Sequence, residues 1–126
     1  MPRAVFLVET GLEKDGIVTE VLKSMFSSQA GDYITAVDES SVILIKALEP
    51  NTSHDELMNI AETIVAMVNG EAMMNVKVAF GTIVSELKDV SKSYKEAKMA
   101  LDVGKIFYGN RNIIAYSNLG IGRLIY

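Results

Sequence analysis

The chain contains no cysteine and a single histidine among its 126 residues. Without cysteine, the sequence excludes a disulfide framework, a cysteine-ligated zinc site and a thiol nucleophile. One histidine excludes histidine-rich metal sites and leaves little room for a Ser-His-Asp triad. Several classes of enzyme are therefore excluded before any pattern is considered.

Positive charge and long apolar runs are also scarce. The chain has 12 Lys and Arg against 16 Asp and Glu, which gives a net charge of −4. A general nucleic-acid binder needs surplus cationic charge to release counterions from phosphate, so we expect no direct nucleic-acid contact. No stretch approaches the ~18 apolar residues of a membrane span. The first residues, Met1-Pro2-Arg3, lack the apolar region of a signal peptide. We therefore expect a cytoplasmic protein with no membrane partner.

Apolar patterning predicts alternating strands and helices in one globular domain. Strands are predicted at 4–9, 32–37, 42–48, 76–80 and 112–116, and helices at 15–26, 53–68 and within 87–107. Ser53 and Glu56 have capping-box spacing, and Asn69-Gly70 is expected to end the helix that they begin. The order β-α-β-β-α-β-α-β predicts an α/β (α+β sandwich) fold. We expect a mixed β-sheet with an antiparallel hairpin and with helices packed on it.

The C-terminal residues 119–126, LGIGRLIY, are typical of an apolar helix that starts without a polar finish. We therefore expect a domain at 1–118 and, at 119–126, the start of a helix that continues into a segment absent from this chain.

Four motifs in the C-terminal half carry a resemblance to a known family. They are VAFG at 78–81, SYKEAKMAL at 93–101, NIIAY at 112–116 and LGIGRL at 119–124. In this order and at these distances they resemble the GGDEF-like domain of the CdaR/PucR-type bacterial transcription regulators of sugar-diacid and purine use. That domain is a degenerate relative of the diguanylate cyclase domain. The resemblance implies a GGDEF/nucleotidyl-cyclase-like sheet, a sensor domain before this module and a helix-turn-helix segment after it.

Cyclase chemistry can be tested residue by residue against the motif of the resembled cyclases. A cyclase needs acids at the end of the first strand and in the hairpin to hold Mg²⁺, and two hairpin glycines to let the nucleotide approach. When Asp38-Glu39 is aligned with the acidic pair, Ala36 and Val37 occupy the glycine positions and Ser40 the aromatic position. Val37 is β-branched and resists positive φ. We therefore expect no enzymatic activity, no catalytic residue and no cofactor.

The candidate ligand-binding residues are Glu9, Asp38 and Glu39. Glu9 ends the first strand and could face Glu39 across the sheet edge as a magnesium site, but the plainer interpretation is that both are solvated turn acids, and we expect no metal centre. One hypothesis is a non-catalytic module that relays a sensor signal and helps two copies associate. The alternative is a degenerate domain that senses a nucleotide or another small anion with Mg²⁺ but does not turn it over.

Overall fold

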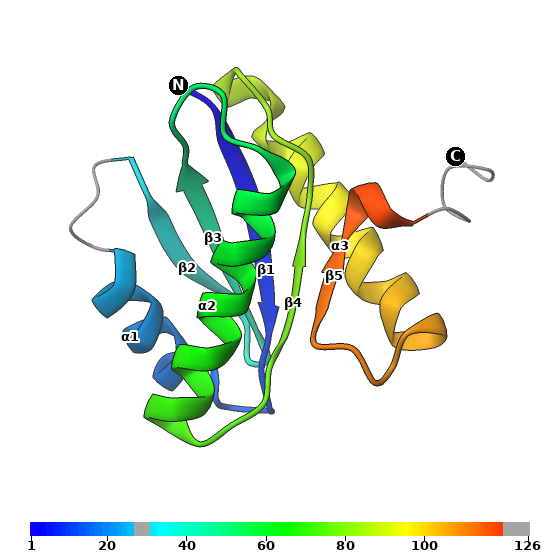
Figure 1. The fold of residues 1–126 in the computed structure, drawn as a ribbon. Coiled ribbons are helices and arrows are strands. Elements are labelled where there is room, and N and C mark those ends of the chain that lie inside the picture. Colours follow the sequence, from blue (N-terminus) through cyan, green and yellow to red (C-terminus); the bar gives the residue numbers. More distant parts are fainter. Residues whose placement is uncertain (27–30, 120–126) are drawn as a thin grey trace.

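The computed structural model describes residues 1–26 and 31–119 (Figure 1). The elements are β1 (Arg3–Glu9), α1 (Asp15–Phe26), β2 (Tyr33–Asp38), β3 (Ser41–Ala47), α2 (His54–Ala72), β4 (Lys77–Phe80), α3 (Val90–Phe107) and β5 (Ile113–Ala115), with the 3₁₀ turns η1 (Leu87–Asp89) and η2 (Tyr116–Asn118). This order confirms the predicted one. In the expected helix at 119–126, residues 120–126 lie outside the described residues. No helix within the described ranges is long and apolar enough to cross a membrane.

The five strands form one mixed sheet in the order β2-β3-β1-β4-β5. β1 lies at the centre and runs antiparallel to both of its neighbours, β3 and β4. β2 and β3 form the predicted hairpin, and β5 runs parallel to β4. β4 and β5 can be parallel because α3 connects them: this crossover returns the chain to the end of the sheet at which β4 began.

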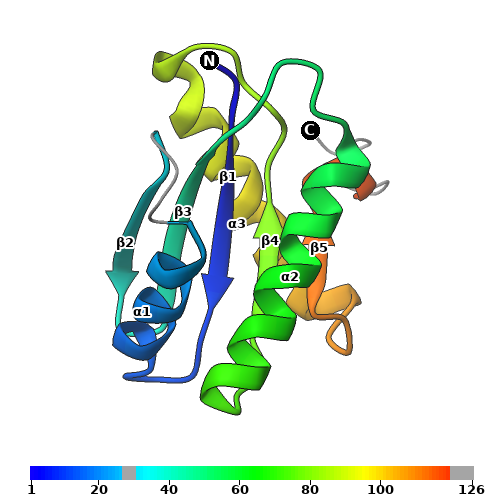
Figure 2. The same cartoon turned by 60° about the vertical axis from the view of Figure 1, so that its left-hand side comes forward.

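Helices cover both faces of the sheet (Figure 2), with α1 and α2 on one face and α3 on the other. Alternate side chains of a strand point to opposite faces. Phe6 and Val8 of β1 therefore pack under α1 and α2, and Val5 and Leu7 pack under α3. This double coverage explains why β1 is a continuous apolar run rather than an alternating one.

α2 begins as predicted but ends later. Ser53 is its N-cap and accepts a hydrogen bond from the Glu56 amide at 3.3 Å. The expected stop at Asn69-Gly70 is wrong, because the helix continues through Gly70 to Ala72. The residue that ends it is Met73, which adopts the left-handed conformation with φ 53° and donates its amide to the Asn69 carbonyl.

The start of α3 is held against the centre of the sheet by a set of hydrogen bonds that we call the α3 clamp. The Ser93 hydroxyl accepts the Val5 amide at 3.1 Å and donates to the Thr82 carbonyl at 2.9 Å. Glu96 accepts the amide and the hydroxyl of Thr82, at 2.9 and 2.6 Å. Gly81 permits the approach, since a Cβ there would overlap the Ser93 carbonyl oxygen. Ser93 and Glu96 of the SYKEA motif therefore hold the helix against the sheet.

Replacing Gly81 by alanine tests the clamp. We expect Gly81→Ala to destabilise the fold at the upper end of the ~1–3 kcal/mol seen for overpacking, because a backbone oxygen cannot rotate away. Gly70→Ala is the matched control, since nothing lies within 4 Å of an added Cβ there. Removing a glycine from a helix interior should stabilise by about 0.5–1 kcal/mol. Urea unfolding measures both; equal effects of the two substitutions would contradict the clamp.

Candidate functional site

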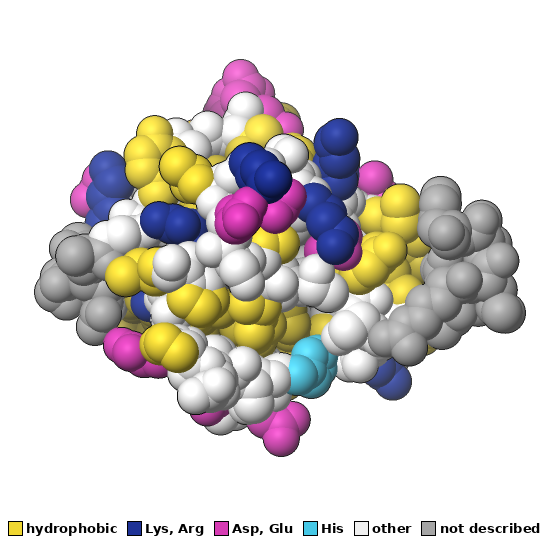
Figure 3. Space-filling model, turned by 90° about the horizontal axis from the view of Figure 1, so that it is seen from above, with side chains coloured by type: hydrophobic (Ala, Val, Ile, Leu, Met, Phe, Trp, Pro, Cys, Tyr) yellow, Lys and Arg dark blue, Asp and Glu magenta, His cyan; other side chains and the backbone are white. Residues whose placement is uncertain are grey.

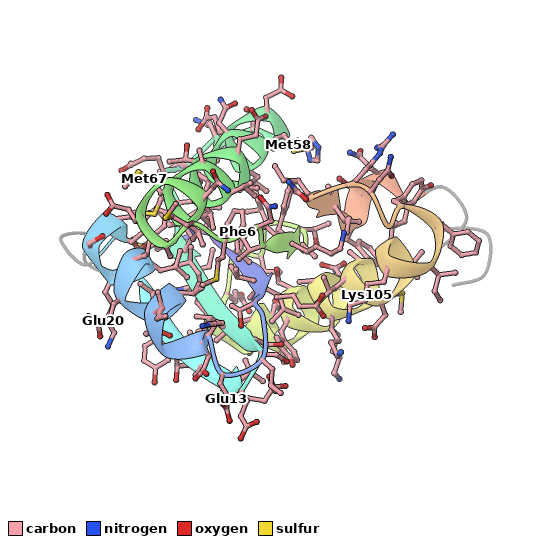
Figure 4. The ribbon with its side chains drawn as sticks, turned by 90° about the horizontal axis from the view of Figure 1, so that it is seen from below. Phe6, Glu13, Glu20, Met58, Met67 and Lys105 are labelled. Carbon is pink, nitrogen blue, oxygen red and sulfur yellow. The ribbon has the colours of Figure 1, made fainter. Side chains whose placement is uncertain are left out.

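The three candidate carboxylates gather at one end of the sheet, where β1 ends and the β2–β3 hairpin turns. The Thr10 amide donates to the Ser40 carbonyl at 2.8 Å, and the Glu13 amide donates to the Glu39 carbonyl at 2.9 Å. The loop after β1 is thereby bonded to the hairpin. Figure 4 shows this end from below, with Glu13 in that loop and Lys105 on α3.

Glu9 is neutralised by a cation from the chain itself. Its side chain lies on the α3 face of the sheet, because it continues the alternation of Val5 and Leu7. Its carboxylate forms an ion pair with the Lys105 ammonium near the end of α3. The two side chains are 25% and 44% exposed, so the pair contributes little stability but places a positive charge on the carboxylate.

Asp38 uses its carboxylate to close the hairpin turn. One oxygen accepts the Ser40 amide at 2.8 Å and the Ser40 hydroxyl at 3.3 Å. The backbone hydrogen bond from Ser40 is the largest cause that holds the pKa of Asp38 below 3.8. Lys98 of α3 also lowers this pKa by electrostatic attraction. Asp38 is therefore a turn residue whose carboxylate is engaged mainly by Ser40.

Glu39 lies exposed at the tip of the hairpin. The structure thus brings Glu9, Asp38 and Glu39 to the same end of the sheet, but it gives each a different environment. Within residues 1–26 and 31–119, no three histidine, aspartate or glutamate side chains form a group that could hold a metal ion.

The hairpin backbone at Ala36 and Val37 is extended and does not use the left-handed conformation that glycines would permit. Ala36 and Val37 belong to β2, and the pairing with β3 is irregular between Ala36 and Asp38. In the described part of the chain, positive φ at residues other than glycine occurs only at Glu13, Asn51 and Met73. The bend is therefore made without left-handed residues, as β-branched Val37 requires.

Sequence reasoning did not connect Lys98 or Lys105 with the candidate carboxylates. Lys98, Asp102 and Lys105 follow at i, i+4 and i+7, which places them on one face of α3, and Lys98 forms an ion pair with Asp102 at 3.2 Å. The spacing was available in the sequence. The position of this face beside Glu9 and the hairpin was not, because it depends on how α3 crosses the sheet.

A second contact that the sequence did not indicate lies at the opposite end of the sheet, where α2 begins. The side chain of His54 is exposed, and its Nδ1 atom lies 3.2 Å from the hydroxyl oxygen of Ser117 in η2. Its ring packs near Phe80, with 5.8 Å between the ring centroids. Figure 3 shows the histidine at this end of the molecule. His54 therefore connects α2 to the segment that follows β5.

The titration of Asp38 tests the hairpin geometry. We expect its carboxyl group to titrate below 3.8 in the folded protein, and NMR can follow this as the pH is lowered. Because the folded pKa is lowered, the stabilising contribution is present at neutral pH and is lost as the pH falls through that pKa. Ser40→Ala should retain most of the shift, since the largest cause is the backbone amide. A return to 3.8 in Ser40→Ala would contradict this assignment.

The comparison with protein-family models agrees with this architecture. No curated protein matches the chain. A family model described as "GGDEF-like domain" matches residues 1–103, which cover β1 to most of α3. The match therefore includes the hairpin, the α3 clamp and all three candidate carboxylates, and the chain belongs to the GGDEF-like domain family.

Proposed function

We propose that this domain is a non-catalytic regulatory and dimerisation module of a CdaR/PucR-type transcription regulator. In this proposal it acts in the cytoplasm, relays the state of a sensor domain that precedes it to a helix-turn-helix segment that follows it, and uses no cofactor. The observation that carries the proposal is the ion pair of Glu9 with Lys105 at the end of β1.

An internal ammonium group opposes metal-dependent nucleotide chemistry at this place. Mg²⁺ is bound by carboxylate oxygens that remain free for it, and it neutralises nucleotide phosphates. At Glu9 a lysine already supplies the positive charge, and a divalent cation beside it would be repelled. Asp38 is likewise engaged by the Ser40 amide. The arrangement therefore favours a structural role for these acids.

The topology supports a relay. β1 runs antiparallel to β4, and β4 runs parallel to β5, so β1 begins and β5 ends at the same end of the sheet. A domain joined before β1 and a segment joined after β5 would meet at this end. His54 lies there and contacts Ser117 of η2. A displacement of α2 would thereby reach the segment that follows β5.

Thermal unfolding with nucleotide and Mg²⁺ tests the proposal against the sensor alternative. We expect the melting temperature to stay unchanged with millimolar GTP or ATP and Mg²⁺, because Glu9 is paired with Lys105 and Asp38 is engaged by the Ser40 amide. A ligand at about 100 times its Kd would stabilise the fold by ~2.7 kcal/mol, or several degrees.

Glu39→Ala and Lys105→Met serve as controls for this measurement. Glu39→Ala should leave the melting behaviour with nucleotide as it is in the unmodified chain, since Glu39 is an exposed turn residue. Lys105→Met removes the cation from Glu9 and shows whether the lysine is what prevents binding. A shift of several degrees in the unmodified chain that Glu39→Ala abolishes would replace the relay with a nucleotide sensor. Turnover of GTP would make the domain an enzyme.

His54→Phe tests the connection between α2 and η2. Phenylalanine keeps a ring against Phe80 but cannot hydrogen-bond to Ser117. We expect hydrogen exchange at the Leu119 amide, which bonds to the Tyr116 carbonyl, to become faster, while global stability changes by less than about 0.5 kcal/mol. Glu62→Gln, at another exposed position of α2, is the control. Unchanged exchange at Leu119 would argue against this route.

A further inference from the structure

The strand β2 lies at one edge of the sheet, so one side of its backbone has no partner strand among the described residues. Natural edge strands are usually protected by proline, lysine, short length or a bulge. β2 has six residues, YITAVD, with neither proline nor lysine, and only the irregularity before Asp38 interrupts it. The opposite edge, β5, has three residues. β2 is therefore the edge that is open to another strand.

Two hydrogen bonds fix which backbone groups of β3 face β1. The Thr10 amide donates to the Ser40 carbonyl, and the Leu48 amide donates to the Pro2 carbonyl, both at 2.8 Å. Hydrogen-bonded pairs alternate along an antiparallel ladder. The even-numbered residues of β3 therefore bond to β1, and the odd-numbered ones bond to β2.

The same alternation fixes the outer edge of β2. Tyr33 and Thr35 are paired with odd-numbered residues of β3, so their backbone groups point inward. The backbone groups of Ile34 and Ala36 consequently point outward, away from the sheet. Each offers one amide donor and one carbonyl acceptor.

The side chains beside this edge are apolar and exposed. α3 lies over β1, β4 and β5 and leaves β2 uncovered on that face (Figure 1). Tyr33 is 60% exposed and Val37 is 45% exposed. Thr35 lies on the same face of the strand as Tyr33, and Val37 follows at the irregularity before Asp38.

We propose that β2 pairs antiparallel with β2 of a second copy of this chain, about a twofold axis at Thr35. In this register, Ile34 and Ala36 of each copy exchange their outward hydrogen bonds with Ala36 and Ile34 of the other. Tyr33 of one copy then lies opposite Val37 of the other, and the two Thr35 side chains oppose each other. A pair of an aromatic and a β-branched side chain and a pair of two threonines are both favourable across neighbouring strands.

The occupant is a second copy because the edge complements itself. A twofold contact must match a surface with the same surface, and this segment places each exposed apolar side chain opposite another. The pairing would join two five-stranded sheets into one. The inference rests on the proposed function, in which two copies associate, and it names the surface that they use. A ladder this short belongs with weak interfaces, which bury less than ~1,200 Å² in total.

Single cysteines test the geometry directly, because the chain has none of its own. Thr35 would form a non-hydrogen-bonded pair across the axis, with Cα atoms about 4.5 Å apart, within the range of a disulfide at about 4.4–6.8 Å. We expect Thr35→Cys to form a disulfide-linked dimer under mild oxidation at least ~10-fold faster than Ser91→Cys, an exposed control on α3. Equal rates would overturn the proposal.

Sedimentation of uncrosslinked variants separates this inference from the proposed function. The unmodified chain and Thr35→Val should dimerise with rising concentration, whereas Thr35→Lys should remain monomeric, because like charges would oppose each other at the axis. A monomeric unmodified chain at millimolar concentration would overturn the pairing. A dimer that persists in Thr35→Lys would also overturn it, but would leave the proposed dimerisation module intact through another surface.

Discussion

The position of α3 depends on one close approach, between Gly81 at the end of β4 and Ser93 in the first turns of the helix. The Ser93 hydroxyl satisfies the amide of Val5, a buried backbone group in the central strand that would otherwise lack a partner where β4 ends. An unpaired buried amide costs about 1–3 kcal/mol. The clamp therefore both docks the helix and completes the ladder. It also fixes which face of α3 reaches the far end of β1.

That docking determines the character of the candidate site. Lys98 and Lys105 lie one and three turns beyond the clamp; Lys105 forms an ion pair with Glu9, and Lys98 lowers the pKa of Asp38 by electrostatic attraction. Of the candidate acids, Glu9 is consequently neutralised by Lys105, Asp38 is used locally in the hairpin turn, and Glu39 lies exposed at the tip. The same docking leaves β2 uncovered on the α3 side, so the edge that we propose for dimerisation follows from the position of this helix.

Much of the architecture could be predicted from the sequence, because it follows local patterns. The element order, the hairpin and the Ser53 cap come from periodicity and turn chemistry. The end of α2 could not, since Gly70 is also compatible with a helix interior and the left-handed residue is Met73, a residue type that seldom adopts it. The partner of Glu9 could not either. Lys105 is 96 positions away along the chain, and only the crossing of α3 brings the two side chains together.

The most direct test of the account is whether Glu9 and the hairpin bind a divalent cation. Titration with Mn²⁺, followed by NMR line broadening, measures this residue by residue. The internal ion pair predicts that the amides of Glu9 and Asp38 broaden no more than that of Glu62, an exposed acid on α2. Selective, saturable broadening at Glu9 and Asp38 would contradict this account and would show that a metal ion displaces Lys105 from Glu9.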